Sequence, residues 1–214
     1  MRLVILFLFI GLICCRKDPV LSIHHTNQNK LIALQPLNEY SGAELSSLQR
    51  ELSNFFNAQV IVLPSLQIPV SYRSSTTTEG YSYLADSLIQ FLLNRKQDRV
   101  DEIIGLTHDE MLIVKNTGLL APDKTTTLSF FQRVKGLGYI SEPACVISDY
   151  SFISTDTAIT NKRLRKVVLH EVGHNLGLDN CKTDACLMSE KNGDNAILDN
   201  GNGDYCERCK RKLN

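Results

Sequence analysis

The sequence has no excess of charge of either sign. Its 214 residues carry 23 Lys and Arg against 23 Asp and Glu, so the formal net charge is zero at pH 7. Domains that bind nucleic acid present clustered positive charge to the phosphate backbone. The two short basic runs, at residues 162–166 and 210–212, are typical of solvated surfaces. We therefore expect no nucleic-acid partner.

A hydrophobic run long enough to span a bilayer is also missing, because a transmembrane helix needs about 20 apolar residues. The apolar run Leu3–Ile10 follows Arg2 and has the length of the core of a secretory signal. It leads to Leu12, Cys14 and Cys15, an arrangement that resembles a bacterial lipoprotein signal with Cys15 as the lipidated residue. An ordinary cleaved signal or an uncleaved anchor is the alternative interpretation.

Export determines the organisation that we expect for the chain. Residues 1–15 would be a signal peptide, residues 16–29 a polar tether and residues 30–214 the folded domain. The protein is then periplasmic or located in the cell envelope, and lipidation of Cys15 would attach it to the membrane. No repeat or linker divides the domain, whose length suits a single core.

Local patterns predict an α/β fold. Short apolar runs predict strands at residues 30–35, 58–63, 101–107 and 144–148. Apolar residues at helical spacing predict helices at residues 41–56 and 83–95, and a long helix capped by Thr155 or Asp156. Alternating strands and helices favour helices packed on a twisted sheet. Residues 65–80 predict an exposed loop, and residues 110–140 stay open between strand and loop.

Histidine is scarce, with five in the chain, yet His170 and His174 lie four residues apart in the last predicted helix. Because an α-helix turns once in about 3.6 residues, both imidazoles project from one face. Such a pair suits a zinc ion, and Glu171 between them can take a proton from a zinc-bound water. Gly177 follows three residues after His174 and can adopt the left-handed conformation that ends a helix. The sequence therefore predicts a catalytic zinc site here.

Four of the seven cysteines lie in the last 34 residues: Cys181, Cys186, Cys206 and Cys209. Four thiolates in two close pairs form a closed tetrahedral set, which is typical of a structural zinc site. Exported cysteines usually oxidise, so two disulfides are the alternative. The short spacings within each pair favour zinc. The acidic, glycine-rich segments between the pairs lack the ligand spacing of an EF-hand and predict turns.

Residues 170–209 together resemble the archaemetzincin family, whose signature is HExxHxxG-x3-C-x4-C-x-M-x17-C-x2-C. Every fixed spacing of that signature occurs here. The resemblance implies one metzincin-like metallopeptidase domain over residues 30–214. This domain would have a twisted mixed sheet with packed helices, an active-site helix and a C-terminal segment stapled by a zinc ion on four cysteines.

The resemblance also implies two zinc ions and a role for each matching residue. His170 and His174 would bind the catalytic zinc, Glu171 would be the general base, and Met188 would form an apolar floor beneath the metal. The structural zinc would be held by Cys181, Cys186, Cys206 and Cys209. The implied activity is peptide-bond hydrolysis on a peptide or protein substrate by a monomer. Tyr205 is a candidate for stabilising the oxyanion.

Position 180 departs from the family pattern. Archaemetzincins have a histidine directly before the first cysteine, whereas this chain has Asn180, preceded by Asp179. Asn180 could bind zinc through its carbonyl oxygen, or Asp179 through its carboxylate after a small backbone shift. The third option is a site of two histidines that binds zinc poorly or not at all. The chain would then be an inactive metzincin-fold protein with only the structural zinc. A surface-anchored binding module with disulfides and no zinc is a further alternative.

Overall fold

The computed structural model describes residues 30–38, 40, 42–74, 81–120, 125, 127–191 and 193–213. The expected signal peptide (1–15) and tether (16–29), with Cys15, His24 and His25, lie outside these residues. Within the described part of the chain, no helix is long and apolar enough to cross a membrane.

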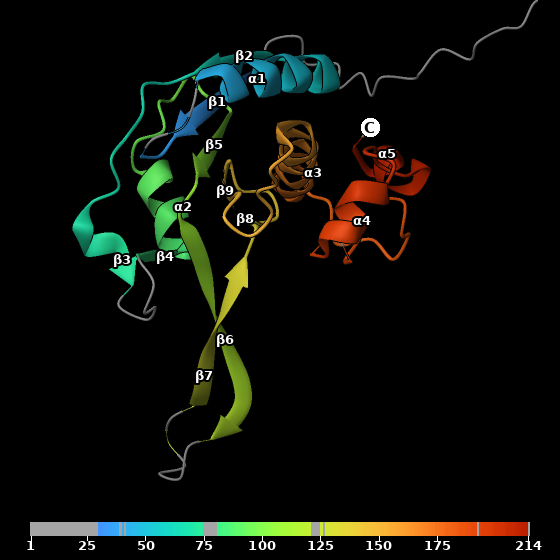
Figure 1. Cartoon of the computed structure of the whole chain (residues 1–214). Coiled ribbons are helices and arrows are strands. Elements are labelled where there is room, and N and C mark those ends of the chain that lie inside the picture. The colour runs from blue at the N-terminus through green and yellow to red at the C-terminus, as the bar shows by residue number, and fades with distance from the viewer. Residues whose placement is uncertain are drawn as a thin grey trace, which may run out of the picture.

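The centre of the fold is a five-stranded mixed sheet with strand order β2-β1-β5-β9-β8 (Figure 1). Its strands are β1 (Leu31–Pro36), β2 (Gln59–Val62), β5 (Glu102–Thr107), β8 (Gly136–Gly138) and β9 (Ala144–Ser148). The strands β2, β1, β5 and β9 run parallel to one another, and β8 pairs antiparallel with β9 at the edge of the sheet. Every residue of β5 and β9 is buried, as expected of parallel strands that are covered on both faces.

Helices cover both faces of this sheet. They are α1 (Gly42–Phe56), α2 (Ala85–Leu93) and α3 (Thr157–Asn175). Two short helices, α4 (Asn195–Asn200) and α5 (Glu207–Leu213), follow in the chain, and α4 packs against α3 (Figure 1). One core joins Leu52 of α1 and Val168 of α3 to Ile104, and a second core joins Leu88 of α2 to Ile103. Because neighbouring strand residues point to opposite faces, α1 and α3 lie on one face of the sheet and α2 on the other.

A second sheet has the order β3-β4-β6-β7, with β3 (Arg73–Ser74) after a short 3-10 helix (Val70–Tyr72), β4 (Ser82–Leu84), β6 (Glu110–Leu120) and β7 (Thr127–Val134). Beyond the body of the protein, β6 and β7 continue as a two-stranded arm (Figure 1). The arm contains a register shift between Asn116 and Leu120, where Gly118 has a φ of 73°. The described residues of the segment 110–140, which the sequence left open, are thus mainly strand.

The predicted α/β class is confirmed, with two local corrections. The second helix begins at Ala85, because Ser82–Leu84 form β4 and pair with β6. Arg73–Ser74 form β3 inside the predicted loop and pair with β4. Both corrections arise from strand partners that lie outside the local sequence window.

Candidate functional site

The long helix α3 carries both histidines. The Asp156 carboxylate accepts a hydrogen bond of 2.8 Å from the Ala158 N–H and so caps the helix start. Val168 and Val172 on the opposite side are buried in the core. His170 and His174 are left facing a cleft, with their Nε2 atoms 3.1 Å apart.

Backbone carbonyls hold the outer nitrogen of each imidazole. His170 Nδ1 lies 2.7 Å from the Leu187 oxygen, and His174 Nδ1 lies 2.7 Å from the Leu178 oxygen. A carbonyl only accepts, so each Nδ1 carries the proton and each Nε2 keeps a lone pair for a metal. Burial lowers the pKa of His170 to about 4, so that ring is neutral at pH 7. Neutral imidazole is the form that binds zinc.

Glu171, between the two histidines on α3, packs against β8. A Cβ added at Gly136 would lie 2.6 Å from Glu171 Cγ, and one at Gly138 would lie 2.6 Å from the Glu171 backbone oxygen. The two glycines therefore allow the strand to approach the helix this closely. Burial raises the pKa of the Glu171 carboxyl to about 8, although a hydrogen bond from the Gly138 backbone lowers it in part. Such a group can accept and release a proton near neutral pH.

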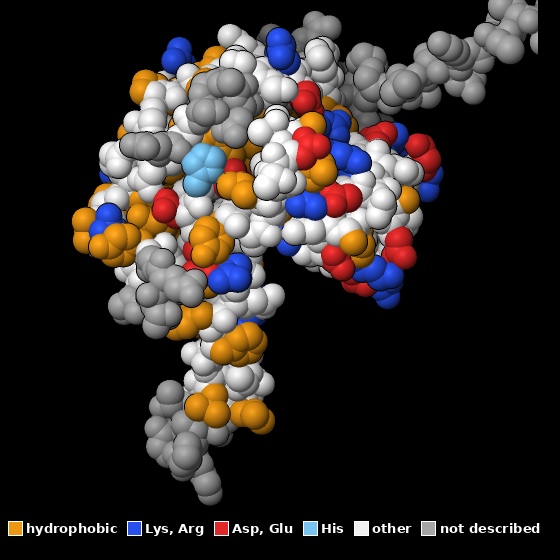
Figure 2. Space-filling view, viewed as in Figure 1, with side chains coloured by type: hydrophobic (Ala, Val, Ile, Leu, Met, Phe, Trp, Pro, Cys, Tyr) orange, Lys and Arg blue, Asp and Glu red, His pale blue; other side chains and the backbone are white. Residues whose placement is uncertain are grey.

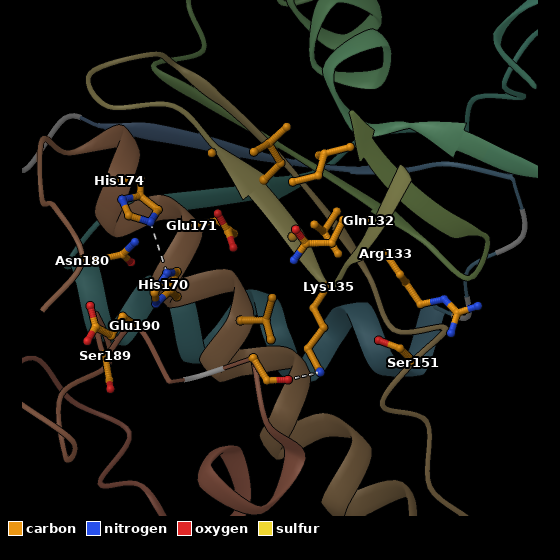
Figure 3. Close-up of a pocket in the computed structure, with 17 residues that line it drawn as sticks. Gln132, Arg133, Lys135, Ser151, His170, Glu171, His174, Asn180, Ser189 and Glu190 are labelled. Atoms are coloured by element: carbon orange, nitrogen blue, oxygen red, sulfur yellow. Dashed lines mark hydrogen bonds between the residues drawn. The ribbon is translucent and has the colours of Figure 1, made fainter. Parts of the chain in front are cut away.

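The cleft has a volume of about 460 Å³ and three walls (Figure 3). The first is α3 with His170, Glu171 and His174, and the second is the end of β7 with β8. The third comprises Asn180, Ser189, Glu190 and Gly193. Lys135 Nζ donates a hydrogen bond to the Gly193 oxygen and so ties the second wall to the third. The volume is in the range of small-molecule and peptide sites.

The structure places Asn180, and not Asp179, at the cleft. The chain turns at Gly177, whose φ of 93° is the left-handed conformation expected there. Asn180 then lines the cleft, whereas the Asp179 carboxylate lies 3.1 Å from Lys212 Nζ and is 66% exposed. His108, the remaining described histidine, does not line the cleft and lies 2.9 Å from Asp149.

Sequence reasoning missed Glu190, whose carboxylate lies beside Asn180 in the cleft wall (Figure 3). A short parallel bridge between Cys181 and Ser189 brings the two segments together. The Cys181 N–H donates to the Met188 oxygen at 2.6 Å, and the Glu190 N–H donates to the Cys181 oxygen at 3.2 Å. The only sequence signal was the position of Glu190 two residues after Met188.

Met188 is fully buried behind the site. A Cβ added at Gly173 would clash with Met188 Sδ, so the missing side chain at this position of α3 makes room for the methionine. Tyr205 does not reach the cleft. Its hydroxyl donates a hydrogen bond of 2.7 Å to the Leu169 oxygen in the core, which leaves the oxyanion candidate on the wrong side of α3.

The four C-terminal cysteines form a second cluster. Cys181 and Cys206 have sulfurs 3.8 Å apart, and those of Cys186 and Cys209 are 3.7 Å apart. All four sulfurs lie within 4.8 Å of one another. Tetrahedral zinc with Zn–S bonds of about 2.3 Å separates its sulfurs by about 3.8 Å, whereas a disulfide requires about 2.05 Å. The donor set therefore fits a structural zinc ion.

Comparison with known proteins gives a consistent result. A family model described as Peptidase family M54 matches residues 39–214. An archaemetzincin of Haloquadratum walsbyi is 35% identical over 107 residues, covering 45% of this chain and 60% of that protein. One of Pyrococcus abyssi is 24% identical over 192 residues, covering 86% and 94%. The chain spans 48–60% of the length of the first curated relatives that it matches.

Solved structures share the fold. The archaemetzincin of Methanopyrus kandleri has a TM-score of 0.70 at 20% identity, covering 87% of this chain and 94% of that one. The archaemetzincin of Archaeoglobus fulgidus, complexed with malonate, has a TM-score of 0.67 at 22% identity, covering 85% and 99%. At these identities the likeness concerns the architecture.

Proposed function

Because the chain belongs to peptidase family M54, as its resemblance to the archaemetzincins predicted, we propose that it is a zinc-dependent peptidase. One observation carries the proposal: two imidazole Nε2 atoms lie 3.1 Å apart beside a buried carboxyl in one cleft. The substrate class is a peptide or protein, consistent with a cleft whose wall includes two edge strands, β7 and β8.

The catalytic zinc would be held by His170 and His174, with the Asn180 side-chain oxygen as the third donor. A bound zinc ion polarises the substrate carbonyl and lowers the pKa of a water molecule. The bonds from each Nδ1 to a backbone carbonyl keep both rings aimed at one point. The second zinc would be held by the four cysteines, where it ties α5 to the segment that follows α3.

Glu171 is the group that moves the proton. Its carboxylate takes a proton from the attacking water and passes it to the leaving amine. Burial raises the pKa of this carboxyl to about 8, and the positive charge of a bound zinc ion would lower it, so that the group could both take and release a proton near neutral pH. Because Gly136 and Gly138 have no side chains, β8 lies directly against Glu171 and excludes bulk water from that side.

The test is Glu171→Ala, with metal content and peptide cleavage measured on the same preparation. General base catalysis contributes roughly 10²–10⁴-fold, so we expect turnover to fall by at least that range. Zinc content should stay close to that of the natural protein, because Glu171 is not a ligand. Turnover that survives the substitution would refute the mechanism. Protein whose only zinc is on the cysteines would refute the peptidase assignment.

Export belongs to the same proposal. Residues 1–15 would direct the protein to the periplasm or cell envelope, and Cys15 would carry a lipid. Mass spectrometry of the mature N-terminus tests this directly. A lipidated Cys15 supports the anchored form, cleavage elsewhere supports a free exported form, and an intact Met1 would contradict export by a cleaved signal.

A further inference from the structure

The arm formed by β6 and β7 exposes large apolar side chains. Val114, Leu119, Leu128, Phe130 and Phe131 are 43–65% exposed. Figure 2 shows hydrophobic side chains along the arm where it leaves the body. Apolar side chains that gather on an exposed surface mark interaction sites more often than isolated ones do.

The two faces of the arm lead to different places. On β7, Leu128, Phe130, Gln132 and Val134 share one face because strand side chains alternate. We call this face, with its β6 partners Lys115 and Ile113, the cleft face. Ile113, Gln132 and Val134 all line the cleft, so the cleft face continues from the arm into the site. Arg133, on the other face of β7, also lines the cleft, and Figure 3 shows the Gln132 and Arg133 side chains leaving the strand in different directions.

The opposite face carries Val114 and Phe131, which are paired across the two strands. It leads to Arg133, whose guanidinium forms an ion pair with Glu110 and lies 5.4 Å above the Tyr150 ring. This face also exposes apolar side chains, but it ends at Arg133, which lines the cleft with its guanidinium paired to Glu110. Phe131, 48% exposed, is therefore a natural control for Phe130, which is 51% exposed.

A strand edge accompanies the cleft face. Among the described residues, β7 is the last strand of its sheet and β8 the last strand of the central sheet. Only Lys135 separates the two strands, so the edge of β7 continues into that of β8, where the Gly138 backbone is already hydrogen-bonded to Glu171 of the catalytic helix. Unpaired edges accept an extended peptide, with alternate side chains held in pockets.

We propose that the cleft face of the arm is a second binding site for the polypeptide substrate. Leu128 and Phe130 would hold an apolar segment of the same extended chain that enters the cleft. The inference rests on the proposed peptidase function. The cleft face continues along Gln132 and Val134 into the cleft, as a binding surface for a substrate chain must. A surface that binds a membrane or a second copy of the protein has no reason to continue into the cleft.

The geometry sets the substrate length that is required. Gly136 lies beside Glu171, and Phe130 precedes it by six residues. At about 3.3 Å per residue, the apolar site is about 20 Å from the catalytic carboxyl. A hexapeptide centred on the cut bond reaches only about 10 Å to either side. Short peptides therefore do not reach Leu128 and Phe130 when they are bound in the cleft, whereas long peptides do.

The experiment compares Phe130→Ser with the control Phe131→Ser on two substrates. One is a fluorogenic hexapeptide, and the other is an 18-residue peptide with the same centre and flanks rich in Leu and Phe. For Phe130→Ser we expect KM for the long peptide to rise about tenfold, which corresponds to about 1.4 kcal/mol. We expect kcat and the hexapeptide kinetics to stay unchanged. Phe131→Ser should change neither.

The outcomes distinguish a failure of the proposed arm site from a failure of the proposed peptidase function. If the natural protein cleaves both peptides and the two serine variants behave alike, the arm site is refuted while the peptidase function stands. If it cleaves neither, the proposed function fails. The arm is then tested by anisotropy of the labelled long peptide on Glu171→Gln, with and without Phe130→Ser. Tenfold weaker binding supports the arm site, and equal binding refutes it. Loss of vesicle binding or of self-association in Phe130→Ser, without a change in peptide affinity, also refutes it.

Discussion

A buried carboxyl at the start of β5 should make the protein less stable as the pH rises. Glu102 is 6% exposed, and its Oε2 accepts a hydrogen bond of 2.9 Å from Asn175 Nδ2 at the end of α3. Burial raises the pKa of Glu102 from 4.5 to about 7, although the Asn175 hydrogen bond and the positive charges of Lys30 and Lys96 lower it. The change to test is Glu102→Gln, which keeps an acceptor for Asn175 and removes the charge.

The sign and size follow from proton linkage. Below pH 4.5 the carboxyl is protonated in both states and costs nothing. Between pH 4.5 and 7 the unfolded chain releases the proton while the folded chain keeps it, so stability falls by about 1.4 kcal/mol per pH unit. Above pH 7 both states are ionised and the full loss, about 3 kcal/mol, is present.

The assay is urea unfolding of the natural protein and of Glu102→Gln at half-unit steps from pH 4 to 8.5. We expect the difference in the free energy of unfolding to grow with pH in favour of the variant and to level off above pH 7. The metal sites titrate in the same way in both proteins, so their contribution cancels in the difference. A difference that does not change with pH would show that Glu102 is not held neutral by burial, and would refute the argument.

Three further predictions concern the packing around Glu171 and the two proposed metal sites. Gly138→Ala should destabilise the fold by about 1–3 kcal/mol, because its Cβ would lie 2.6 Å from the Glu171 backbone oxygen. Gly193→Ala, whose Cβ meets nothing within 4 Å, is the matched control, and denaturant unfolding measures both. Cys186→Ser should bind one zinc ion fewer per chain in elemental analysis and should have a lower melting temperature. An intact mass of the natural protein that shows two disulfides would contradict the zinc cluster. Asn180→His should bind zinc roughly tenfold more tightly in chelator competition, because imidazole is the stronger donor. Cleavage seen only in that variant would make the natural chain an inactive relative.

The central sheet and its helices were predictable because their signals are local. The continuous apolar runs of β5 and β9 indicate strands that are buried on both faces. The start of α3 is marked by Asp156, and its end is followed by Gly177, the glycine with φ of 93°. Each signal lies within a few residues of the structure that it specifies.

The arm was not predictable in the same way. Its residues have no regular alternation of buried and exposed positions, since both faces of β7 contact solvent. The pairing partner of β4 is β6, whose first residue lies 26 positions beyond the end of β4 at Leu84. Such strands form because a distant segment pairs with them, so the local pattern carries little information.

The site likewise has a part that local spacing predicts and a part that depends on the tertiary fold. Spacing on one helix was sufficient to predict that His170, His174 and Glu171 lie together, as they do in the cleft. The wall that faces them required the tertiary fold, because Gly136 and Gly138 approach Glu171 only through the β8–β9 pairing. Glu190 reached the cleft through the Cys181–Ser189 bridge, which no spacing rule specifies.

The same bridge explains why position 180 keeps its place despite the change of residue. Gly177 sets the turn before it, and the backbone bonds of Cys181 to Met188 and Glu190 fix the chain after it. Both restraints act on the backbone, and neither involves the Asn180 side chain. The nature of the third donor is therefore separable from the fold: a histidine at 180 would occupy the same place beside His170 and His174. Zinc affinity should then change with the residue at 180 while the free energy of unfolding of the metal-free protein stays constant. An Asn180→His variant that unfolds more easily without metal would contradict this separation.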